Sequence, residues 1–459
     1  MDRPVFDMLL RASHRGSLHM PGHKGIPPFG AVDAYALDTT ELPVTDDLYS
    51  PTGELDEAQR RYAACAGAGA SIFMHNGSTC GVHAMLQLYA REGDTVLLPR
   101  NAHLSAVNAC ILGGLRPVWM PVTQRADGYC YLREETVLEA LARHPEARAV
   151  LVTSPDYYGC CMPLERVARA ARAQGTRLVV DEAHGAHLPW LNAAPSAARH
   201  ADAWVQSVHK TLPGLTGAAV LHLADARDRE AALRLIRREQ TSSPSFLLML
   251  SIDDARAFME REGASRLRAV CGAANGLRAR LASLGYRDAH EAWADTGMRF
   301  DPTRLVIDAP QGGPTLLSSL AARGLDAEMC DWRRVVVILS AMDDETTVAR
   351  LEEALRAIPP VARDIPPPVE LPELPPRRMS PREAVMAPCE AVPLDRAEGR
   401  VAAQAAGLYP PGIPLVCPGE ELTREIAQRL IRHGDRQLFG VEGERLVCVR
   451  QSSLTLTER

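Results

Sequence analysis

The chain has 459 residues, of which 46% are hydrophobic and 24% are charged, and its formal net charge is −6. This length suggests about two to four domains, and the composition is ordinary for a globular protein without global disorder. The slightly acidic balance excludes a general basic surface of the kind that binds nucleic acid or anionic membranes non-specifically. We therefore expect a small-molecule partner, with no nucleic acid and no membrane.

Eleven cysteines are scattered along the chain, apart from the adjacent pair Cys160 and Cys161, and none lies in a CxxC spacing. This usage favours a reducing compartment and argues against a zinc ribbon. Residues 1–18 contain no apolar segment of signal-peptide length, and no window approaches the roughly 18 apolar residues that a membrane span needs. We therefore expect a cytoplasmic protein.

Between residues 71 and 223, short apolar runs alternate with amphipathic stretches, which is typical of βα units around a mostly parallel sheet. One helix shows its period clearly, because Leu164, Val167, Ala168 and Ala171 fall on a single face. The predicted strands are 71–75, 95–98, 117–120, 149–153, 177–180, 203–207 and 218–223. This pattern predicts one large α/β domain.

A long helical stretch at 253–284 then leads to a smaller α+β unit, which includes the apolar run 334–339 and ends near residue 358. Prolines recur so often after it that neither helix nor central strand can persist, which predicts an extended linker. The predicted division is an N-terminal active-site segment (1–30), a large domain (31–245), a small α+β domain (246–358), a proline-rich linker (359–382) and a small C-terminal domain (383–459).

Polar side chains follow four of the predicted strands, at the edge where ligands of open α/β sheets bind. The turn Asn76-Gly-Ser-Thr79 opens a helix after the first of these strands. Its glycine, hydroxyls and free backbone N–H groups suit a phosphate. An ordinary helix N-cap explains this motif equally well when it is taken alone.

The strand at 177–180 runs into Asp181-Glu-Ala-His-Gly-Ala-His187. A carboxylate at the tip of a buried strand needs a partner, and a protonated pyridine nitrogen is one such partner. The same letters mark a helicase box, but the chain lacks the GxxxxGK[ST] phosphate loop on which that box depends. His184 and His187 could instead bind a metal ion. No cysteine or third clustered acid accompanies them at a suitable spacing, so we expect no metal.

The strand at 203–207 ends in Ser207-Val-His209-Lys210. Lysine forms an imine with a carbonyl group once partial loss of water lowers its pKa. A lone lysine at a strand end is more commonly solvated, and it is the context that favours chemistry here. The fourth strand end carries Arg100-Asn-Ala-His103, whose flat ring could stack on a flat cofactor or serve as an ordinary structural histidine.

Taken in order, these motifs resemble the cofactor site of fold-type I pyridoxal-phosphate enzymes, and longer strings resemble the Orn/Lys/Arg decarboxylase family. These strings are Met20-Pro-Gly-His-Lys-Gly25, Asp47-Leu-Tyr-Ser-Pro-Thr-Gly-Glu54, Thr153-Ser-Pro-Asp-Tyr-Tyr-Gly159, Thr241-Ser-Ser-Pro-Ser245, Tyr409-Pro-Pro-Gly-Ile-Pro414 and Pro418-Gly-Glu420. The resemblance implies an α/β fold: a fold-type I large domain with a mostly parallel sheet, a smaller α+β domain and a small C-terminal domain. It also implies a short form without the amino-terminal receiver-like domain of longer members.

The resemblance implies roles for individual residues. Lys210 would hold pyridoxal 5'-phosphate as an imine, Asp181 would pair with the pyridinium nitrogen, and His103 would stack on the ring. The residues expected at the cofactor are Ser78, Thr79, His103, Asp181, His184, Ser207, His209, Lys210 and, from the neighbouring subunit of a homodimer with a shared site, Ser243. Glu420 would meet the distal cation of the substrate.

The implied reaction is decarboxylation of arginine, lysine or ornithine to the amine and CO2, in amino acid metabolism and polyamine biosynthesis. The chain departs from the family's usual residues at Leu104, at Asp156, and at Phe246, where Tyr is usual. Because the large-domain motifs specify the cofactor better than the reaction, an aminotransferase or a β-eliminating lyase stays open. The departures also leave open a non-catalytic paralogue with a regulatory role.

Overall fold

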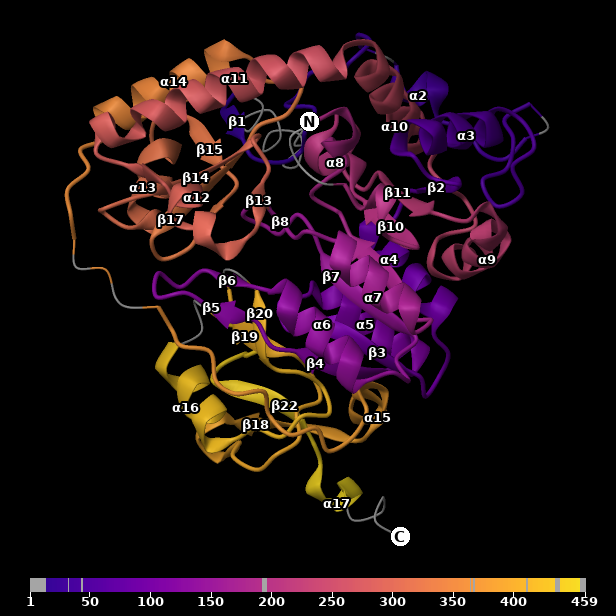
Figure 1. The fold of residues 1–459 in the computed structure, drawn as a ribbon, viewed down its shortest axis with the longest axis vertical. Coiled ribbons are helices and arrows are strands. Elements are labelled where there is room, and N and C mark those ends of the chain that lie inside the picture. The colour runs from indigo at the N-terminus through magenta and orange to yellow at the C-terminus, as the bar shows by residue number, and fades with distance from the viewer. Residues whose placement is uncertain are drawn as a thin grey trace, which may run out of the picture.

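A computed structural model describes residues 14–454 of the chain, except 32, 43, 192–195, 364, 366–367, 410–411 and 434–437. Figure 1 shows a large α/β unit at the right, a smaller α+β unit at the upper left and a C-terminal unit, in yellow, at the bottom. In the part of the chain described here, no helix is long and apolar enough to cross a membrane.

All seven strands predicted for the α/β region are present, and they form one sheet with the order β2-β11-β10-β9-β7-β3-β4. The strands from β10 to β4 in this order are parallel, whereas β11 is antiparallel to both of its neighbours. Their bounds are β2 (Ala70–Met74), β3 (Thr95–Pro99), β4 (Arg116–Met120), β7 (Ala149–Thr153), β9 (Arg177–Asp181), β10 (Ala203–Gln206) and β11 (Ala219–Leu223). The prediction of a mostly parallel sheet is confirmed.

Two groups of helices cover this sheet. In the first group, α5 (Leu104–Gly113) and α9 (Arg229–Glu239) both pack against α4 (Gly77–Tyr89). In the second group, α6 (Glu134–Arg143) packs against α7 (Glu165–Ala173). The chain crosses the sheet in opposite directions through α4–α5 and through α6–α7, so right-handed crossovers place these pairs on opposite faces. A Cβ on Gly81 would lie 2.6 Å from Val205 Cγ2, so glycine lets α4 approach β10 closely.

The smaller unit is built on an antiparallel sheet with the order β12-β14-β17-β16. Its elements are β12 (Arg287–Asp288), β14 (Arg304–Asp308), β16 (Met329–Cys330), β17 (Arg334–Ile338), α11 (Ala264–Leu281), α12 (Ala289–Ala292), α13 (Gly313–Ala321) and α14 (Glu345–Ala357). The preceding helix α10 (Phe246–Phe258) packs against α3 (Glu54–Ala66) and β2, so it lies against the large unit. The N-terminal strand β1 (Gly16–Leu18) pairs with β15 (Leu325–Ala327) and joins the smaller unit.

The described residues of 359–380 form neither helix nor regular strand, apart from a single bridge between Arg377 and Glu420. The helix α15 (Pro381–Met386) then begins with a capping box of Ser380 and Glu383, and it packs against α5. The other C-terminal elements are β18 (Cys389–Pro393), β19 (Ala406–Leu408), β20 (Ile413–Val416), α16 (Arg424–His433), β21 (Leu438–Phe439), β22 (Arg445–Val449) and α17 (Gln451–Leu454). Residues 410 and 411 of the predicted Tyr409 turn lie outside the described residues.

Candidate active site

The carboxyl ends of the parallel strands bring the predicted residues to one edge of the sheet. β9 ends at Asp181, β10 leads directly into Ser207 and Lys210, and β3 leads to His103. Because β11 is antiparallel to both β10 and β2, β2 runs in the same direction as β10. Ser78, which follows β2, therefore reaches the same edge.

Lys210 lies in α8 (Val208–Thr211), a single helical turn, and its Nζ lies 3.1 Å from His184 Nε2. Loss of contact with water lowers the pKa of Lys210. The carboxylates of Asp181 and Glu328 oppose this shift, and the Arg304 guanidinium adds to it. A larger share of neutral amine is what imine formation requires.

The two adjacent acids at the end of β9 have different surroundings. The Asp181 side chain accepts a hydrogen bond from the Ala183 N–H at 3.1 Å, and the residue is 6% exposed. Glu182 is fully buried, and it accepts hydrogen bonds of 2.6 Å from Gln206 Nε2 and from the Ala197 N–H. Burial raises the pKa of Glu182 to about 8. Glu182 is thus tied into the protein interior, and Asp181 is the acid that the strand carries to the site.

The Ser207 hydroxyl donates a hydrogen bond of 2.8 Å to Ser78 Oγ. Ser78 stands in the first turn of α4, where backbone N–H groups have no partner within the helix, and Thr79 follows it with an exposed side chain. The Gly77 N–H donates to Gly217 O at 2.8 Å, and both glycines have positive φ (72° and 98°). This turn offers hydroxyls and backbone donors together, which suits a phosphate.

His103 caps the amino end of α5, because its Nδ1 accepts a hydrogen bond from the Ser105 N–H at 3.2 Å. Loss of contact with water lowers the pKa of His103. Asp181 opposes this effect, while Lys210 and His83 add to it. The neighbouring Leu104, one of the family departures, is 37% exposed. The imidazole is therefore oriented by its own helix.

Two further histidines, the predicted cofactor ligand His209 and the alternative metal ligand His187, have clear partners. His209 Nδ1 lies 3.1 Å from the Ala218 carbonyl oxygen, so this nitrogen donates and Nε2 is the acceptor. His187 Nε2 lies 3.0 Å from the buried Asp301 Oδ2 of the smaller unit. Through this contact, His187 joins the large unit to the smaller one. No group of three or more metal-ligating side chains occurs within the described ranges.

In the part of the chain that the structure describes, no hydrogen bond joins Ser243 or Glu420 to Lys210, Asp181 or the Ser78–Ser207 pair. Ser243 is exposed in the turn between α9 and α10, and its N–H donates to Thr241 Oγ1. Glu420 is 1% exposed, and both of its oxygens accept hydrogen bonds of 2.8 Å from the Arg100 guanidinium. The prediction that Glu420 meets a substrate cation is wrong, because its charge is already paired and sealed from water.

The sequence reasoning missed Glu328, whose carboxylate acts on Lys210, and the groups that lie around Glu328. The Tyr157 hydroxyl donates to Glu328 Oε1 at 2.8 Å, and the Met20 N–H donates to Glu328 Oε2 at 2.9 Å. Lys24 Nζ donates to the carbonyl oxygens of His19 and Ile338 at 2.6 and 2.8 Å. One signal could have found Lys24: it and Lys210 are the only lysines in the whole sequence.

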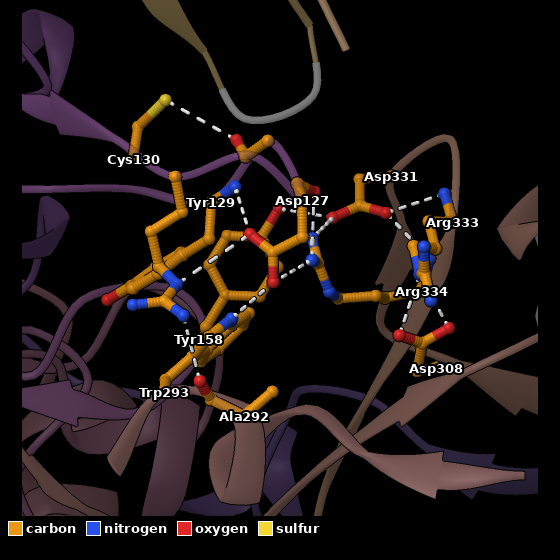
Figure 2. A network of polar contacts seen from close by, with 12 residues as sticks. Asp127, Tyr129, Cys130, Tyr158, Ala292, Trp293, Asp308, Asp331, Arg333 and Arg334 are labelled. Atoms are coloured by element: carbon orange, nitrogen blue, oxygen red, sulfur yellow. Dashed lines mark hydrogen bonds and ion pairs between the residues drawn. The ribbon is translucent and has the colours of Figure 1, made fainter. Parts of the chain in front are cut away.

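The smaller unit is anchored to the large unit by the polar network in Figure 2. Arg334 of β17 forms ion pairs with Asp127 at 2.7 Å and with Asp331 at 3.1 Å. Trp293 Nε1 donates to the same Asp127 at 2.8 Å, and the Trp293 ring stacks on Tyr129 with centroids 3.9 Å apart. Tyr129 belongs to the hairpin of β5 (Thr123–Gln124) and β6 (Cys130–Tyr131), so the network holds the smaller unit against the larger one.

Asp156, the second family departure, takes part in this anchoring. Its Oδ2 accepts a hydrogen bond of 2.6 Å from the Tyr129 hydroxyl, and its Oδ1 accepts from the Tyr158 and Cys160 N–H groups. Burial raises the pKa of Asp156 to about 6, and the Tyr129 hydroxyl opposes the rise. Asp156 therefore helps to hold the β5–β6 hairpin in place through Tyr129. The contacts of Asp156 given above involve neither Lys210 nor Asp181.

The residues at the sheet edge match the chemical groups of pyridoxal phosphate. An amine of lowered pKa suits its aldehyde, a carboxylate suits its ring nitrogen, and a serine pair at a helix N-terminus suits its phosphate. The donor set thus fits this cofactor.

Comparison with known proteins agrees with this fit. Residues 4–308 match the family model described as Orn/Lys/Arg decarboxylase, major domain, and residues 371–436 match the model of the C-terminal domain. An arginine decarboxylase of Bacillus anthracis is 29% identical over 450 residues, which cover 92% of this chain and 91% of that protein. An arginine decarboxylase of Bacillus subtilis (strain 168) is 30% identical over 466 residues, which cover 95% and 94%.

The fold also matches solved structures. Lysine decarboxylase A from Pseudomonas aeruginosa superposes with a TM-score of 0.75 at 21% sequence identity, and the match covers 90% of this chain and 74% of that one. The chain therefore belongs to the Orn/Lys/Arg decarboxylase family of pyridoxal-phosphate-dependent amino acid decarboxylases.

Proposed function

We propose that the chain binds pyridoxal 5'-phosphate and decarboxylates a basic amino acid, with arginine as the first candidate before lysine and ornithine. The observation that carries this proposal is the Lys210 amine beside His184, at the same sheet edge as Asp181 and the Ser78–Ser207 pair. Arginine comes first because the two relatives described above, which match the chain over nearly its full length, are named arginine decarboxylases.

When bound, the cofactor supplies an electron sink for the bond that breaks as CO2 leaves. Lys210 would hold the cofactor at its aldehyde through the neutral amine, and the same nitrogen would be able to donate a proton to the substrate. Asp181 favours a protonated ring nitrogen by Coulomb attraction. Ser78, Thr79, Ser207 and His209 would hold the phosphate, while His103 and His184 would contact the ring.

We further propose a homodimer in which Ser243 of the partner subunit completes the phosphate site. Its support is the exposure of Ser243 on the turn between α9 and α10, where its side chain is free to contact a second chain. All eleven cysteines are free, including the adjacent Cys160 and Cys161, which supports a reducing, cytoplasmic location. Light scattering of the purified chain tests the dimer.

The deciding experiment is a substrate panel. Purified protein loaded with pyridoxal phosphate is incubated separately with arginine, lysine and ornithine, and CO2 and the amine product are measured, the product by mass. We expect stoichiometric CO2 and amine from one of the three, with arginine the fastest. Formation of a keto acid without CO2 would instead identify an aminotransferase and overturn the proposal.

A further inference from the structure

Two consecutive contacts link Lys210 to an arginine of the smaller unit. His184 stands between them: its Nε2 lies 3.1 Å from Lys210 Nζ, and its Nδ1 lies 3.2 Å from Arg304 Nη2. Arg304 is the first residue of β14, and it is fully buried, while His184 is 6% exposed. These contacts form a relay, Arg304–His184–Lys210, which runs from the smaller unit through the protein interior to the amine at the sheet edge.

The direction of each hydrogen bond follows from the chemistry of arginine. A guanidinium only donates, so His184 Nδ1 must accept, and the imidazole proton then lies on Nε2. Nε2–H points to Lys210 Nζ and donates to it. An ammonium has no lone pair with which to accept, so this contact is satisfied only when Lys210 is a neutral amine.

Arg304 is a buried cation whose guanidinium is only partly satisfied by hydrogen bonds. In the part of the chain that the structure describes, its Nε and Nη1 atoms are buried without a hydrogen-bond partner. Buried unsatisfied donors are destabilising, and those of a charged group more so. Gly159 makes room for the stem, because a Cβ there would lie 2.5 Å from Arg304 Cγ, and its φ is +86°. Within the described residues, the guanidinium donates to His184 alone, at Nδ1 and, at 3.5 Å, at the carbonyl oxygen, and its charge also acts on the buried Asp301 carboxylate. Its hydrogen-bonded link toward Lys210 therefore passes through the His184 ring.

We propose that Arg304 is a positioning residue, which fixes the tautomer of His184 and thereby presents Lys210 as a neutral amine to the cofactor aldehyde. This inference rests on the proposed function in one respect, namely that Lys210 is the lysine that binds the cofactor. Arg304 would touch neither substrate nor cofactor. Its effect would be exerted before any substrate arrives.

The charges around Lys210 fix the sign of the expected change. The carboxylates of Asp181 and Glu328 favour its ammonium form, whereas Arg304 disfavours it. The imidazoles of His103, His184 and His209 also face the amine, and the pKa of each is lowered, first by loss of contact with water. With these rings neutral, removing Arg304 leaves two carboxylates unopposed, so the pKa of Lys210 should rise.

The test is a titration of Lys210 in the full-length chain without cofactor. Cyanate carbamoylates neutral amines, and peptide mass spectrometry reads the rate at Lys210 over a pH series; Lys24 is the only other lysine in the sequence. In Arg304→Gln we expect the pKa of Lys210 to rise by about one unit or more, which lowers its neutral fraction near neutral pH about tenfold. Arg304→Lys keeps a cation and should retain most of the low pKa.

A second variant separates the relay from a simple charge effect and guards against misfolding of the first. His184→Phe should also raise the pKa of Lys210, and Arg304→Gln should add little in that background, because the link is already broken. Arg333→Gln is the matched control, since Arg333 directly precedes β17 of the same small sheet and pairs with Asp308, the last residue of β14. It should leave the titration of Lys210 unchanged.

Three outcomes would overturn the inference: an unchanged Lys210 pKa in folded Arg304→Gln, an unchanged pKa in His184→Phe, or fully additive effects in the double variant. The titration needs neither cofactor nor substrate, so it is independent of the substrate panel. A chain that decarboxylates arginine while its Lys210 ignores Arg304 contradicts this inference alone. A chain whose Lys210 responds as expected but which releases no CO2 contradicts the proposed function alone.

Discussion

The hydroxyl of Ser207, just after β10, donates a hydrogen bond of 2.8 Å to the hydroxyl of Ser78 in the first turn of α4. The two serines are 129 residues apart in the chain, and they meet because β2 and β10 end at the same edge of the sheet. Each hydroxyl can turn its proton toward an added anion. The pair therefore adds side-chain donors to those of the helix N-terminus.

Removing either hydroxyl should weaken binding of the phosphorylated cofactor. For Ser207→Ala and Ser78→Ala we expect the Kd for pyridoxal phosphate to rise by about tenfold or more, since hydrogen bonds to a charged group contribute about 1.5–3 kcal/mol. Absorbance titration of cofactor-free protein measures this. Pyridoxal without the phosphate is the matched ligand, and its affinity should stay unchanged. An equal loss for both ligands would refute a phosphate role for this pair.

Replacing the amine at position 210 should abolish the covalent attachment of the cofactor. In Lys210→Ala we expect no visible absorbance from a protein-bound imine, no mass increase after borohydride treatment, and turnover lower by about 10³-fold. Lys24→Arg is the control, because it removes the only other lysine. Its trapped mass should remain on the Lys210 peptide. A normal spectrum and turnover in Lys210→Ala would refute the assignment.

Removing the acid at the end of β9 should damage turnover more than cofactor binding. Asp181→Ala loses the carboxylate that favours a protonated ring nitrogen, and one preorganised electrostatic group of this kind is worth about 10²–10³ in rate. We expect kcat to fall by that factor while much of the bound cofactor remains. Parallel measurement of kcat and bound cofactor checks this. The exposed Glu92→Ala, before β3, should change neither; wild-type turnover in Asp181→Ala would contradict the role.

The seven strands of the large sheet could be predicted because each is a short apolar run between helical stretches, and both faces of a parallel sheet are buried. The period of α7 was equally legible, since Val167, Ala168 and Ala171 are its buried residues. The position of α10 could not be predicted, because an apolar helix shows no preference for one partner surface. It packs against α3 and β2 of the large unit, before the chain continues into the smaller one.

The residues of the candidate site likewise fall into those that could be predicted from the sequence and those that could not. Lys210, Asp181 and Ser78 follow strands of one sheet, so their meeting could be inferred from topology alone. Arg304 and Glu328 come from the smaller unit, and their approach to Lys210 depends on how two separate sheets dock. No spacing in the sequence encodes that docking. Glu420 was misassigned for a related reason, because its partner Arg100 stands 320 residues away.

Glu182 should make the stability of the fold depend on pH. Burial raises its pKa to about 8, against an ordinary value near 4.3, so the folded chain holds a proton that the unfolded chain has released. This stabilising contribution is fully present below about pH 4.3 and is lost as pH rises through about 8, at about 1.4 kcal/mol per pH unit. Glu182→Gln should flatten this decline of Tm with pH in thermal denaturation. Exposed Glu165→Gln should keep it, and a decline unchanged in Glu182→Gln would contradict the assignment.

The Arg100–Glu420 pair should act on stability and leave substrate affinity unchanged. Glu420→Ala leaves the buried Arg100 guanidinium without its carboxylate, and breaking a buried pair in this way costs about 3–5 kcal/mol. We therefore expect a marked fall in Tm, and in protein kept folded at low temperature a KM for the best substrate equal to that of the wild type. The neighbouring Glu421→Ala is the matched control, because its partner Arg378 is largely exposed and such pairs contribute about 0–1 kcal/mol. A tenfold higher KM in Glu420→Ala, at unchanged Tm, would instead indicate that Glu420 contacts the substrate. Thermal denaturation and steady-state kinetics on the two variants therefore distinguish a structural role of Glu420 from a substrate contact.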